Sequence, residues 1–584
     1  MFKLTHFLRP YRKNTYGGQF FKLLEAILEL MIPTLMALII DNGVKYNDRG
    51  YILKIGGLMI LVAVVGVGCA FICQYNAAIA SQGFGTAVRN RLFKHIGTFS
   101  HEALDQIGTS SLINRITNDV NQLQFAVAMW IRLVVRAPFL CIGGIIMAML
   151  INPKLSLLIL AILPIFSFIL VLIMRKSIPL YKTVQRKLDR LAVVVRENLT
   201  GVRVIRAFGN VDYEKARFKG VSTDHAHTAI RVGSITALMN PATLLIMNMG
   251  ILAIIWFGGI QVNGGRMTQG QIIAYINYVI LILTALIVVA NLVVTFTKAG
   301  ASANRVNEIF QMEGSIKDPE IQRGAQAYQP IPGAPMIEFK GVSFRYPDTR
   351  EYALQDLSFQ VRPGQTVGVI GGIGAGKSTL VHLIPRFYDV SQGQVLIGGH
   401  DVREMPQEVL RSKVGIVPQP AVLFTGTVAD NLRWGKDDAG EGELEQALAI
   451  AQAKTFVQAL PQGLDTIITQ GGSNLSGGQR QRITIARALV MVPDILILDD
   501  SSSALDYATD AALAKALKES TRGMTVVNIS QRVSSIKGAD LIIVLDHGQV
   551  VGQGTHQTLL KTSPIYREIC ISQLGNGEAL EDEA

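Results

Sequence analysis

A glycine-rich octapeptide has the residue types and spacing of a phosphate-binding loop. Residues 371–378 read Gly-Gly-Ile-Gly-Ala-Gly-Lys-Ser, and they lie between an apolar strand pattern and a helical one, as G-x-x-x-x-G-K-[ST] requires. Glycines let backbone N–H groups close around phosphates. We expect Lys377 to reach the β- and γ-phosphates of ATP and Ser378 to ligate Mg²⁺. The predicted nucleotide-binding residues of this segment are Gly371, Gly372, Gly374, Gly376, Lys377, Ser378 and Thr379.

Two adjacent aspartates end a second apolar strand pattern. Residues 495–498 read Ile-Leu-Ile-Leu and are followed by Asp499 and Asp500. Mg²⁺ prefers oxygen ligands such as carboxylates. We therefore expect Asp499 to hold Mg²⁺, either directly or through water.

A third motif, between these two, carries a resemblance to a known family. Residues 475–479 read Leu-Ser-Gly-Gly-Gln, which resembles the signature of ATP-binding cassette (ABC) proteins. The resemblance covers essentially the whole chain, and the chain is similar to bacterial multidrug exporters with six membrane spans per half. It implies roles for three further residues: Tyr346 stacks on adenine, Gln419 lies in the Q-loop and contacts Mg²⁺, and Asp506 ends the D-loop.

The resemblance also implies that the signature acts on a second subunit. In the family, two cassettes pair head to tail, and each ATP lies between the phosphate-binding loop of one cassette and the signature of the other. One chain alone would therefore form no complete ATP site. The signature residues expected to reach the partner's ATP are Ser476, Gly477, Gly478 and Gln479.

Two positions depart from the family pattern, and both belong to the ATP site built on this chain's own loop. The family has glutamate after the magnesium aspartate, where this chain has Asp500. Aspartate is one methylene shorter, so its carboxylate should fall about 1 Å short of the attacking water, which can cost roughly 100-fold in rate. The family also has histidine in the switch loop, where this chain has Gln531. Glutamine can bond a phosphate oxygen but cannot become cationic or relay a proton.

Together, the two departures resemble the degenerate subunit of a heterodimeric ABC exporter. The expected partner is a second half-transporter that carries the catalytic glutamate and histidine. The site on Lys377 would then hold ATP and turn it over slowly, while the intact signature serves the partner's catalytic site. A homodimer with two slow sites is the alternative.

The elements that must position these residues fall into two halves. The chain has 584 residues, too many for one core, and 49% of them are hydrophobic, with a mean hydropathy of +0.33. Six apolar runs in the first half have roughly 20 residues or more, enough to cross an apolar layer about 30 Å thick. They are residues 20–40, 52–79, 127–151, 155–174, 238–262 and 272–296.

The net charge of +11 is concentrated in the long loops after the second and fourth runs. The positive-inside rule puts these loops, the N-terminus and the C-terminal half in the cytoplasm of a multi-pass protein of a bacterial cell membrane. Because topology explains the basic excess, we expect membrane lipid rather than nucleic acid as a partner. Residues 100–114 and 201–217 are predicted to form short helices parallel to the membrane. By resemblance these are coupling helices, and the second contacts the partner's cassette.

The predicted fold class is a membrane α-helical domain with the ABC exporter fold, fused to an α/β P-loop NTPase domain, the ABC cassette. Alternation of short β-rich runs with helical patterns favours the α/β class for the second half. The predicted boundaries are 1–300 for the membrane domain, 301–335 for a linker, 336–575 for the cassette and 576–584 for an acidic tail.

The predicted activity is ATP hydrolysis coupled to export of amphipathic drug-like molecules. A lipid or peptide exporter of the same architecture and an ATP-gated regulatory subunit are alternatives. Glu25 and Glu29 share one face of the first apolar run, where carboxylates are costly. They could attract cationic substrates or have a structural role near the inner leaflet. Arg132 and Arg136 could pair with them or mark the cytoplasmic end of the third run.

Overall fold

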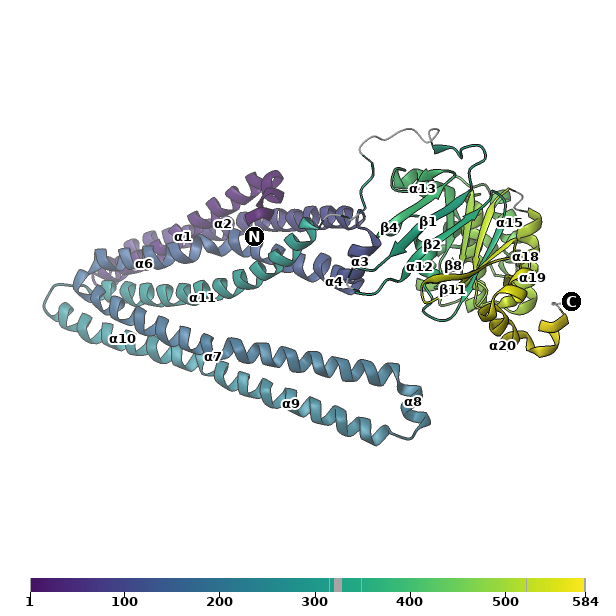
Figure 1. Ribbon diagram of the computed structural model, residues 1–584. Helices are drawn as coiled ribbons and strands as arrows, with labels where there is room; N and C mark the ends of the chain where they lie inside the picture. The colour runs from purple at the N-terminus through teal and green to yellow at the C-terminus, as the bar shows by residue number, and fades with distance from the viewer. Residues whose placement is uncertain are drawn as a thin grey trace. The chain divides into compact units, whose positions relative to one another are not determined.

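The chain forms two compact units in the computed structural model, shown as a ribbon in Figure 1. The structure describes residues 2–312, 314, 316–319, 328–347, 349–520 and 523–581. The first unit comprises Met1–Gly97 and Ser110–Met312, and the second comprises Thr98–Thr109 and Glu313–Ala584. Part of the expected linker at 301–335, and the last three residues of the expected tail, lie outside the described residues.

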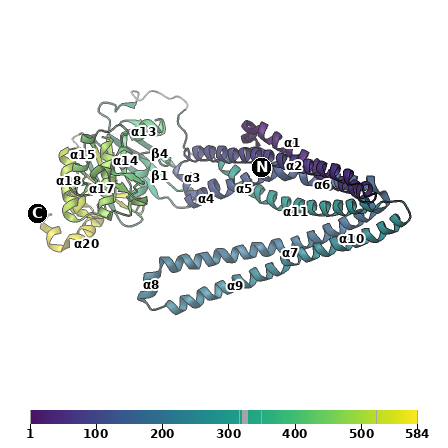
Figure 2. The same ribbon diagram turned by 180° about the vertical axis from the view of Figure 1, so that it is seen from behind.

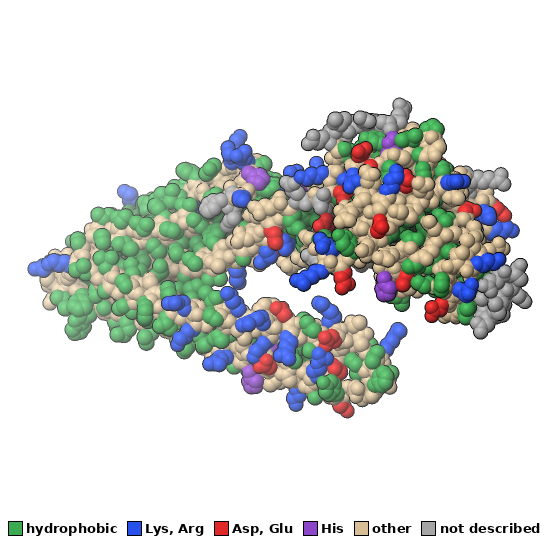
Figure 3. Space-filling view, in the orientation of Figure 1, with side chains coloured by type: hydrophobic (Ala, Val, Ile, Leu, Met, Phe, Trp, Pro, Cys, Tyr) green, Lys and Arg blue, Asp and Glu red, His purple; other side chains and the backbone are tan. Residues whose placement is uncertain are grey.

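The first unit is helical and apolar. Among the described residues it contains six segments long and apolar enough to cross a membrane, so the prediction of six spans is confirmed. Figure 3 shows hydrophobic side chains over much of its visible face. The segments are Lys3–Val44, Arg49–Ile96, Thr109–Ile151, Pro153–Thr200, Val211–Asn263 and Gln269–Gln311.

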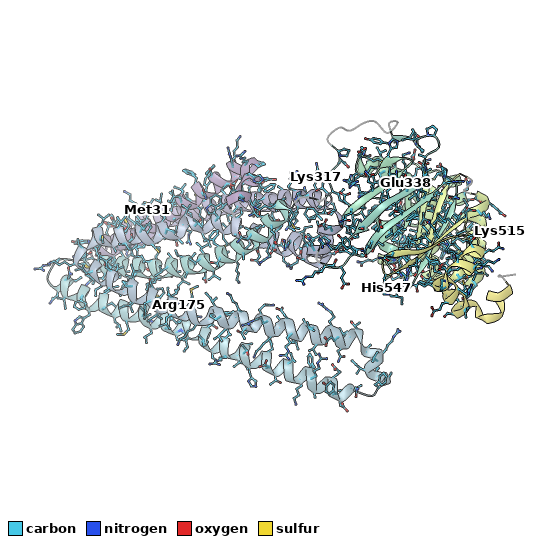
Figure 4. The ribbon with its side chains drawn as sticks, viewed as in Figure 1. Met31, Arg175, Lys317, Glu338, Lys515 and His547 are labelled. Carbon is cyan, nitrogen blue, oxygen red and sulfur yellow. The ribbon has the colours of Figure 1, made fainter. Side chains whose placement is uncertain are left out.

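Within this unit, α1, α2, α5, α6 and α11 pack into a bundle, while α7 runs beside α9 and α10 as a long arm that turns at α8 (Figures 1 and 2). Figure 4 marks α1 by Met31 and α7 by Arg175. Three π-helical segments, in which each turn holds an extra residue, interrupt the bundle helices. The helical elements are η1 (Phe2–Tyr11), α1 (Arg12–Leu38), η2 (Ile39–Val44), α2 (Arg49–Ile96), α4 (Thr109–Asn114), η3 (Arg115–Asp119), α5 (Val120–Met129), η4 (Trp130–Val134), α6 (Arg136–Ile151), α7 (Pro153–Thr200), α8 (Val202–Ala207), α9 (Val211–Ala237), α10 (Met239–Asn263) and α11 (Gln269–Gln311).

The second unit is an α/β domain built on two larger sheets and a strand pair. One sheet has the order β2-β1-β4-β5 and is antiparallel, and the other has the order β12-β11-β3-β10-β9-β6. In the six-stranded sheet only β12 is antiparallel to its neighbour. The strands are β1 (Ile337–Phe344), β2 (Leu354–Val361), β3 (Thr366–Gly371), β4 (Gln392–Ile397), β5 (His400–Asp401), β6 (Val414–Val417), β7 (Gly426–Thr427), β8 (Ile467–Ile468), β9 (Ile495–Asp499), β10 (Thr525–Ile529), β11 (Leu541–Asp546) and β12 (Gln549–Gly554).

Helices of the second unit cover these sheets and connect their strands. The 3₁₀ helices of this unit are short turns between longer elements. The helical elements are α3 (His101–Ile107), α12 (Lys377–Leu383), α13 (Gln407–Lys413), α14 (Val428–Arg433), α15 (Glu441–Ile450), α16 (Lys454–Gln458), η6 (Gly463–Asp465), η7 (Gln470–Gly472), α17 (Gly477–Val490), α18 (Tyr507–Ser520), η8 (Val533–Ser535), α19 (His556–Thr562) and α20 (Pro564–Glu581).

The order of the parallel strands explains where chemistry can occur. Carboxyl ends of parallel strands meet at one edge of a sheet, and ligands bind in the crevice outside that edge. Strands β3, β10, β9 and β6 are consecutive neighbours, and their apolar residues are buried between the layers. The segments that follow them carry Lys377, Gln531, Asp500 and Gln419.

The two long loops contain short helices, whereas their orientation parallel to the membrane stays a prediction. In the first loop, α3 begins after Ser100, whose side chain accepts a hydrogen bond from Ala103 N. Helix α3 packs within the second unit, where the carboxylate of Asp105 accepts a 2.7 Å hydrogen bond from the hydroxyl of Tyr388. In the second loop, α8 connects α7 to α9.

Candidate active site

A pocket of about 410 Å³ at the carboxyl ends of these strands gathers most of the predicted site residues. Gly371 and Gly372 lie at its base, where their carbonyl oxygens contact Lys377. The signature residues and Asp506, all of them described, do not line the pocket. The predicted site residues that line it are Tyr346, Gly374, Gly376, Lys377, Ser378, Thr379, Gln419, Asp499, Asp500 and Gln531.

Glycines shape the loop in front of α12. Gly374 has a φ of +81° and Gly376 a φ of +91°, which side chains rarely tolerate. A β-carbon on Gly376 would also lie 2.7 Å from the carbonyl oxygen of Ala353. Lys377 Nζ donates hydrogen bonds of 2.9 and 2.7 Å to the carbonyl oxygens of Gly371 and Gly372. The loop therefore curls around an ammonium group, which suits binding of a phosphate.

Ser378 and Asp499 form the candidate magnesium site. Ser378 Oγ donates a 3.1 Å hydrogen bond to Asp499 Oδ1, and Asp499 is only 3% exposed. Burial raises the pKa of Asp499, although the Ser378 hydrogen bond and the Lys377 charge act the other way. Burial likewise lowers the pKa of Lys377. A buried carboxylate beside a hydroxyl offers the oxygen ligands that Mg²⁺ takes, together with those of a phosphate chain, so these residues fit the pair of ATP and Mg²⁺.

Asp500 and Gln531, the two residues that depart from the family pattern, contact each other in the pocket. Asp500 Oδ2 accepts hydrogen bonds from Gln419 Nε2 at 3.2 Å and from Gln531 Nε2 at 3.4 Å. Burial raises the pKa of Asp500, and the neighbouring Asp499 charge raises it further. The backbone at Asp500 is left-handed, with a φ of +48°, a region that aspartate enters more readily than most residues. Asp500 and Gln531 thus share one pocket with Lys377.

Tyr346 lies at the aromatic wall of the pocket. Its hydroxyl is 3.1 Å from Thr379 Oγ1, and its ring meets the edges of Phe344 and Tyr388 with centroids 4.9 and 5.4 Å apart. These contacts hold the ring in place while it remains half-exposed. A fixed, partly open aromatic face can stack on a nucleobase.

The signature forms the start of α17, away from the pocket lining. Ser476 caps this helix, because its Oγ accepts a 3.3 Å hydrogen bond from Gln479 N while Ser476 N donates one of 2.9 Å to Gln479 Oε1. Ser476 and Gly477 are exposed. Their hydrogen-bonding groups can therefore contact a ligand outside this chain.

Asp506 has a structural role within this chain, at the start of α18. Its two carboxylate oxygens accept hydrogen bonds of 2.9 Å from the backbone N and the Oγ1 of Thr509, so it caps α18. These bonds lower the pKa of Asp506. Arg532 lies over the Tyr507 ring, 5.0 Å from its centroid, and donates to the carbonyl oxygen of Leu505. The D-loop is thereby tied to the switch loop.

Gln573 of α20 fixes the switch loop and was not among the predicted site residues. Gln573 Nε2 donates a 2.6 Å hydrogen bond to the carbonyl oxygen of Gln531, and its Oε1 accepts one of 2.9 Å from Val533 N. No motif marks a glutamine near the end of a chain, so only the spatial contact identifies it.

A second polar cluster lies in the membrane domain. Glu25 accepts two hydrogen bonds from Lys22 Nζ, at 2.8 and 2.7 Å, and Glu29 accepts one of 2.7 Å from Arg136 Nη2. The proposed pairing with Arg136 is confirmed, whereas Lys22 was not anticipated. Because both carboxylates are neutralised by cations, an attraction of Glu25 and Glu29 for cationic substrates is not supported. Arg132 pairs with neither carboxylate among the described residues.

Comparisons with known proteins agree with this division into two halves. A family model for the "ABC transporter transmembrane region" matches residues 18–286, and one for "ABC transporter" matches residues 354–503. A solved structure of a bacterial Atm1-family ABC exporter with ATP bound has a TM-score of 0.80 and 24% identity, and the match covers 97% of this chain and 99% of that one. The exporter fold that was predicted is thereby confirmed.

Relatives match over most of their length. An uncharacterised ABC transporter ATP-binding protein of Mycobacterium tuberculosis is 39% identical, over 98% of this chain and 97% of the relative. An ATP-dependent lipid A-core flippase of Syntrophus aciditrophicus is 34% identical, over 86% and 82% of the two chains. The probable multidrug resistance ABC transporter YheI of Bacillus subtilis is 32% identical, over 93% and 92%.

Proposed function

Because this chain belongs to the ABC transporter family, as a half-exporter that joins a membrane domain to an ATP-binding cassette, we propose that it is one subunit of a heterodimeric pump that exports amphipathic drug-like molecules. The observation that carries the heterodimer is the shared pocket of Lys377, Asp500 and Gln531. Where the family has a glutamate and a histidine, this pocket has a shorter carboxylate and a neutral amide.

In this proposal the two ATP sites of the pump differ. ATP and Mg²⁺ bound at this chain's loop would be held by Lys377, Ser378 and Asp499, with Tyr346 against the base. Asp500 accepts bonds from two amides, so it holds those side chains in place and activates water poorly. The exposed signature residues Ser476 and Gly477 would complete the partner's site, where hydrolysis is fast.

The turn of the α7–α9 arm offers a surface that a second subunit can contact. Among the described residues of α8, none is buried. Near the turn, Phe208 is 77% and Tyr213 69% exposed. Large apolar side chains exposed together favour a protein contact. We propose that this turn contacts the partner's cassette and that α3 contacts this chain's own, with both cassettes on the cytoplasmic side of the cell membrane.

Purification of the full-length chain with and without its partner tests the heterodimer. The partner is sought as a half-transporter encoded in the neighbouring reading frame, with glutamate and histidine at the two altered positions. We expect the pair to hydrolyse ATP at least tenfold faster than this chain alone, since only the pair has a complete catalytic site. Lys377→Ala in this chain measures any contaminating activity. Turnover by the lone chain equal to that of the pair would overturn the proposal in favour of a homodimer.

A lipid exporter is the second candidate, because one relative is named a lipid A-core flippase. Drug-stimulated ATPase of the reconstituted pair and uptake of a fluorescent drug by inside-out vesicles separate the two. Stimulation and uptake by drugs support multidrug export. Stimulation by lipids alone assigns the second function.

A further inference from the structure

We propose that Gln573 is a positioning residue of the ATP site: from α20 it fixes the backbone at Gln531, so that the Gln531 side chain is held at the terminal phosphate of ATP. This inference rests on the proposed nucleotide site around Lys377. It goes beyond that site because it gives α20, which carries none of the motifs, a part in holding ATP. It starts from a hydrogen bond between two residues that are 42 positions apart in the sequence.

Helix α20 is anchored in a way that directs Gln573 at the switch loop. Tyr566 and Cys570 of α20 are fully buried in an apolar cluster that also contains Val533 and Ile536, just beyond the switch loop. Residues at positions i, i+4 and i+7 share one face of a helix, so Gln573 lies on the same face as the two buried anchors. The packing of α20 therefore brings the amide of Gln573 to the loop.

Gln573 binds the main chain of the loop on both sides of Arg532. Its Nε2 donates a 2.6 Å hydrogen bond to the carbonyl oxygen of Gln531, and its Oε1 accepts one of 2.9 Å from Val533 N. One side-chain amide thus bonds a backbone acceptor and a backbone donor two residues apart, as a neighbouring strand would. Both bonds must break before this segment can shift away from α20.

The other contacts of the loop hold the neighbours of Gln531. Ser530 N donates a 3.2 Å hydrogen bond to the carbonyl oxygen of Val369 in β3, and Arg532 Nη1 donates one of 3.2 Å to a carbonyl oxygen of the D-loop. The carbonyl group of Gln531 itself is bound from α20. The orientation of the peptide unit that follows Gln531 therefore depends on Gln573.

Gln531 is the side chain that the loop contributes to the pocket. It lines the pocket together with Lys377, and its Nε2 lies 3.4 Å from Asp500 Oδ2, which is long for a hydrogen bond. Asp500 follows the magnesium aspartate, Asp499, so the terminal phosphate of ATP is expected at this end. A bond from the Gln531 amide to that phosphate forms with ATP and not with ADP, so Gln573 should affect the affinity for ATP selectively.

The test measures nucleotide binding by the full-length chain in nanodiscs, with Mg²⁺ and the fluorescent analogues MANT-ATP and MANT-ADP. Gln573→Met keeps the length of the side chain and removes both hydrogen bonds. We expect it to weaken ATP binding by about fivefold or more, as loss of a hydrogen bond to a charged group implies, and to change ADP binding less than twofold. Gln573→Glu keeps the acceptor for Val533 N and should recover part of the ATP affinity.

A double variant tests whether Gln573 acts through Gln531. Gln531→Ala alone should also weaken ATP binding, and Gln573→Met added to it should have no further effect, because residues that act as one unit are not additive. The matched control is Gln446→Met, at an exposed glutamine of α15, which should leave both affinities unchanged. A general loss of structure would lower ATP and ADP binding together.

The outcomes separate this inference from the nucleotide site on which it rests. Equal losses of ATP and ADP affinity in Gln573→Met, or fully additive losses in the double variant, would overturn the inference and leave Gln573 a structural role alone. Unchanged ATP affinity in Gln573→Met or in Gln531→Ala would also overturn it, while the site around Lys377 stands. Nucleotide binding that survives Lys377→Ala would refute the site itself, and the inference with it.

Discussion

At the scale of single residues, Asp499 shows how a binding site opposes stability. Its carboxyl is buried beside Asp500, and burial raises the pKa of both. We predict that Asp499→Asn raises the apparent Tm of the nucleotide-free protein by a few degrees, because a buried like charge disappears, while Mg²⁺-dependent stabilisation by ATP is lost. Thermal unfolding with and without Mg²⁺-ATP measures both effects.

The gain from Asp499→Asn should depend on pH in a defined direction. A carboxyl whose folded-state pKa lies above its ordinary 3.8 favours the fold when protonated, and this contribution is lost as the pH rises through the raised value. The Tm difference between variant and wild type should therefore be largest near pH 7 and shrink towards about pH 4. The exposed Asp437→Asn is the control. A destabilised variant at pH 7 would contradict the argument.

The residues that bind phosphate and Mg²⁺ were predictable from the sequence, because that binding requires particular side chains. Residues whose role depends on their contacts in the folded chain were not predictable. Lys377, Ser378 and Asp499 belong to motifs because phosphate and Mg²⁺ demand those groups at those spacings, and the structure brings them into one pocket. Gln573 and Lys22 contribute only an ordinary hydrogen bond or ion pair. Any helix carries such side chains, so their roles depend on contacts that only the folded chain creates.

At the scale of elements, α3 is held against the cassette by groups that titrate. The ring of His101 lies 4.3 Å from that of Phe387. Burial lowers the pKa of His101, as do the charges of His382 and Arg411, although Asp105 opposes them. Burial also lowers the pKa of His382. Both rings therefore favour the neutral form when α3 is docked.

We predict that acidification loosens α3. A histidine whose folded-state pKa lies below its ordinary 6.5 stabilises docking fully above that pH, and the contribution is lost as the pH falls through the lowered value. Hydrogen exchange of residues 98–109, corrected for intrinsic rates, should be faster at pH 5.5 than at pH 7.5. His101→Phe keeps an aromatic ring on Phe387 and should reduce the difference. The control is His547→Gln, at a side chain that is 96% exposed. Equal protection of the wild type at both pH values would refute the prediction.

Elements that follow from composition were predictable, and those that follow from packing were not. Six spans were predictable because a membrane requires about 20 consecutive apolar residues. The buried parallel strands β3 and β9 also read as apolar runs. The π-helical turn η4 has no such pattern, since it arises where Ile131 packs against Gly18. The antiparallel sheet of β1, β2 and β4 was not foreseen either, because its strands bury residues irregularly.

At the scale of the whole molecule, the exposed start of α17 is the feature that a single subunit leaves unexplained. A β-carbon on Gly477 would meet nothing within 4 Å, so this chain imposes no steric need for glycine there. Its backbone φ is not in the left-handed range either. An acidic residue in the first turn of a helix is even favourable. A ligand or partner outside the chain, as proposed for the signature, would account for a glycine at this position.

Gly477→Asp therefore separates the role of the signature in the pump from its role in the fold. We predict that the variant is as stable as the wild type, because the new carboxylate meets only solvent and the helix N-terminus. The ATPase of the assembled pair should fall about 100-fold or more, because that carboxylate would face the phosphates of the partner's ATP.

Gly442→Asp, the control, places the same side chain in the first turn of α15, also with nothing within 4 Å, and should leave the ATPase unchanged. Asp500→Asn should reduce it less than threefold if, as proposed, the site on Lys377 turns over slowly. An active Gly477→Asp pair would show that the signature does not contact ATP across the interface, and equal losses from Gly477→Asp and Asp500→Asn would show that the two sites are not unequal.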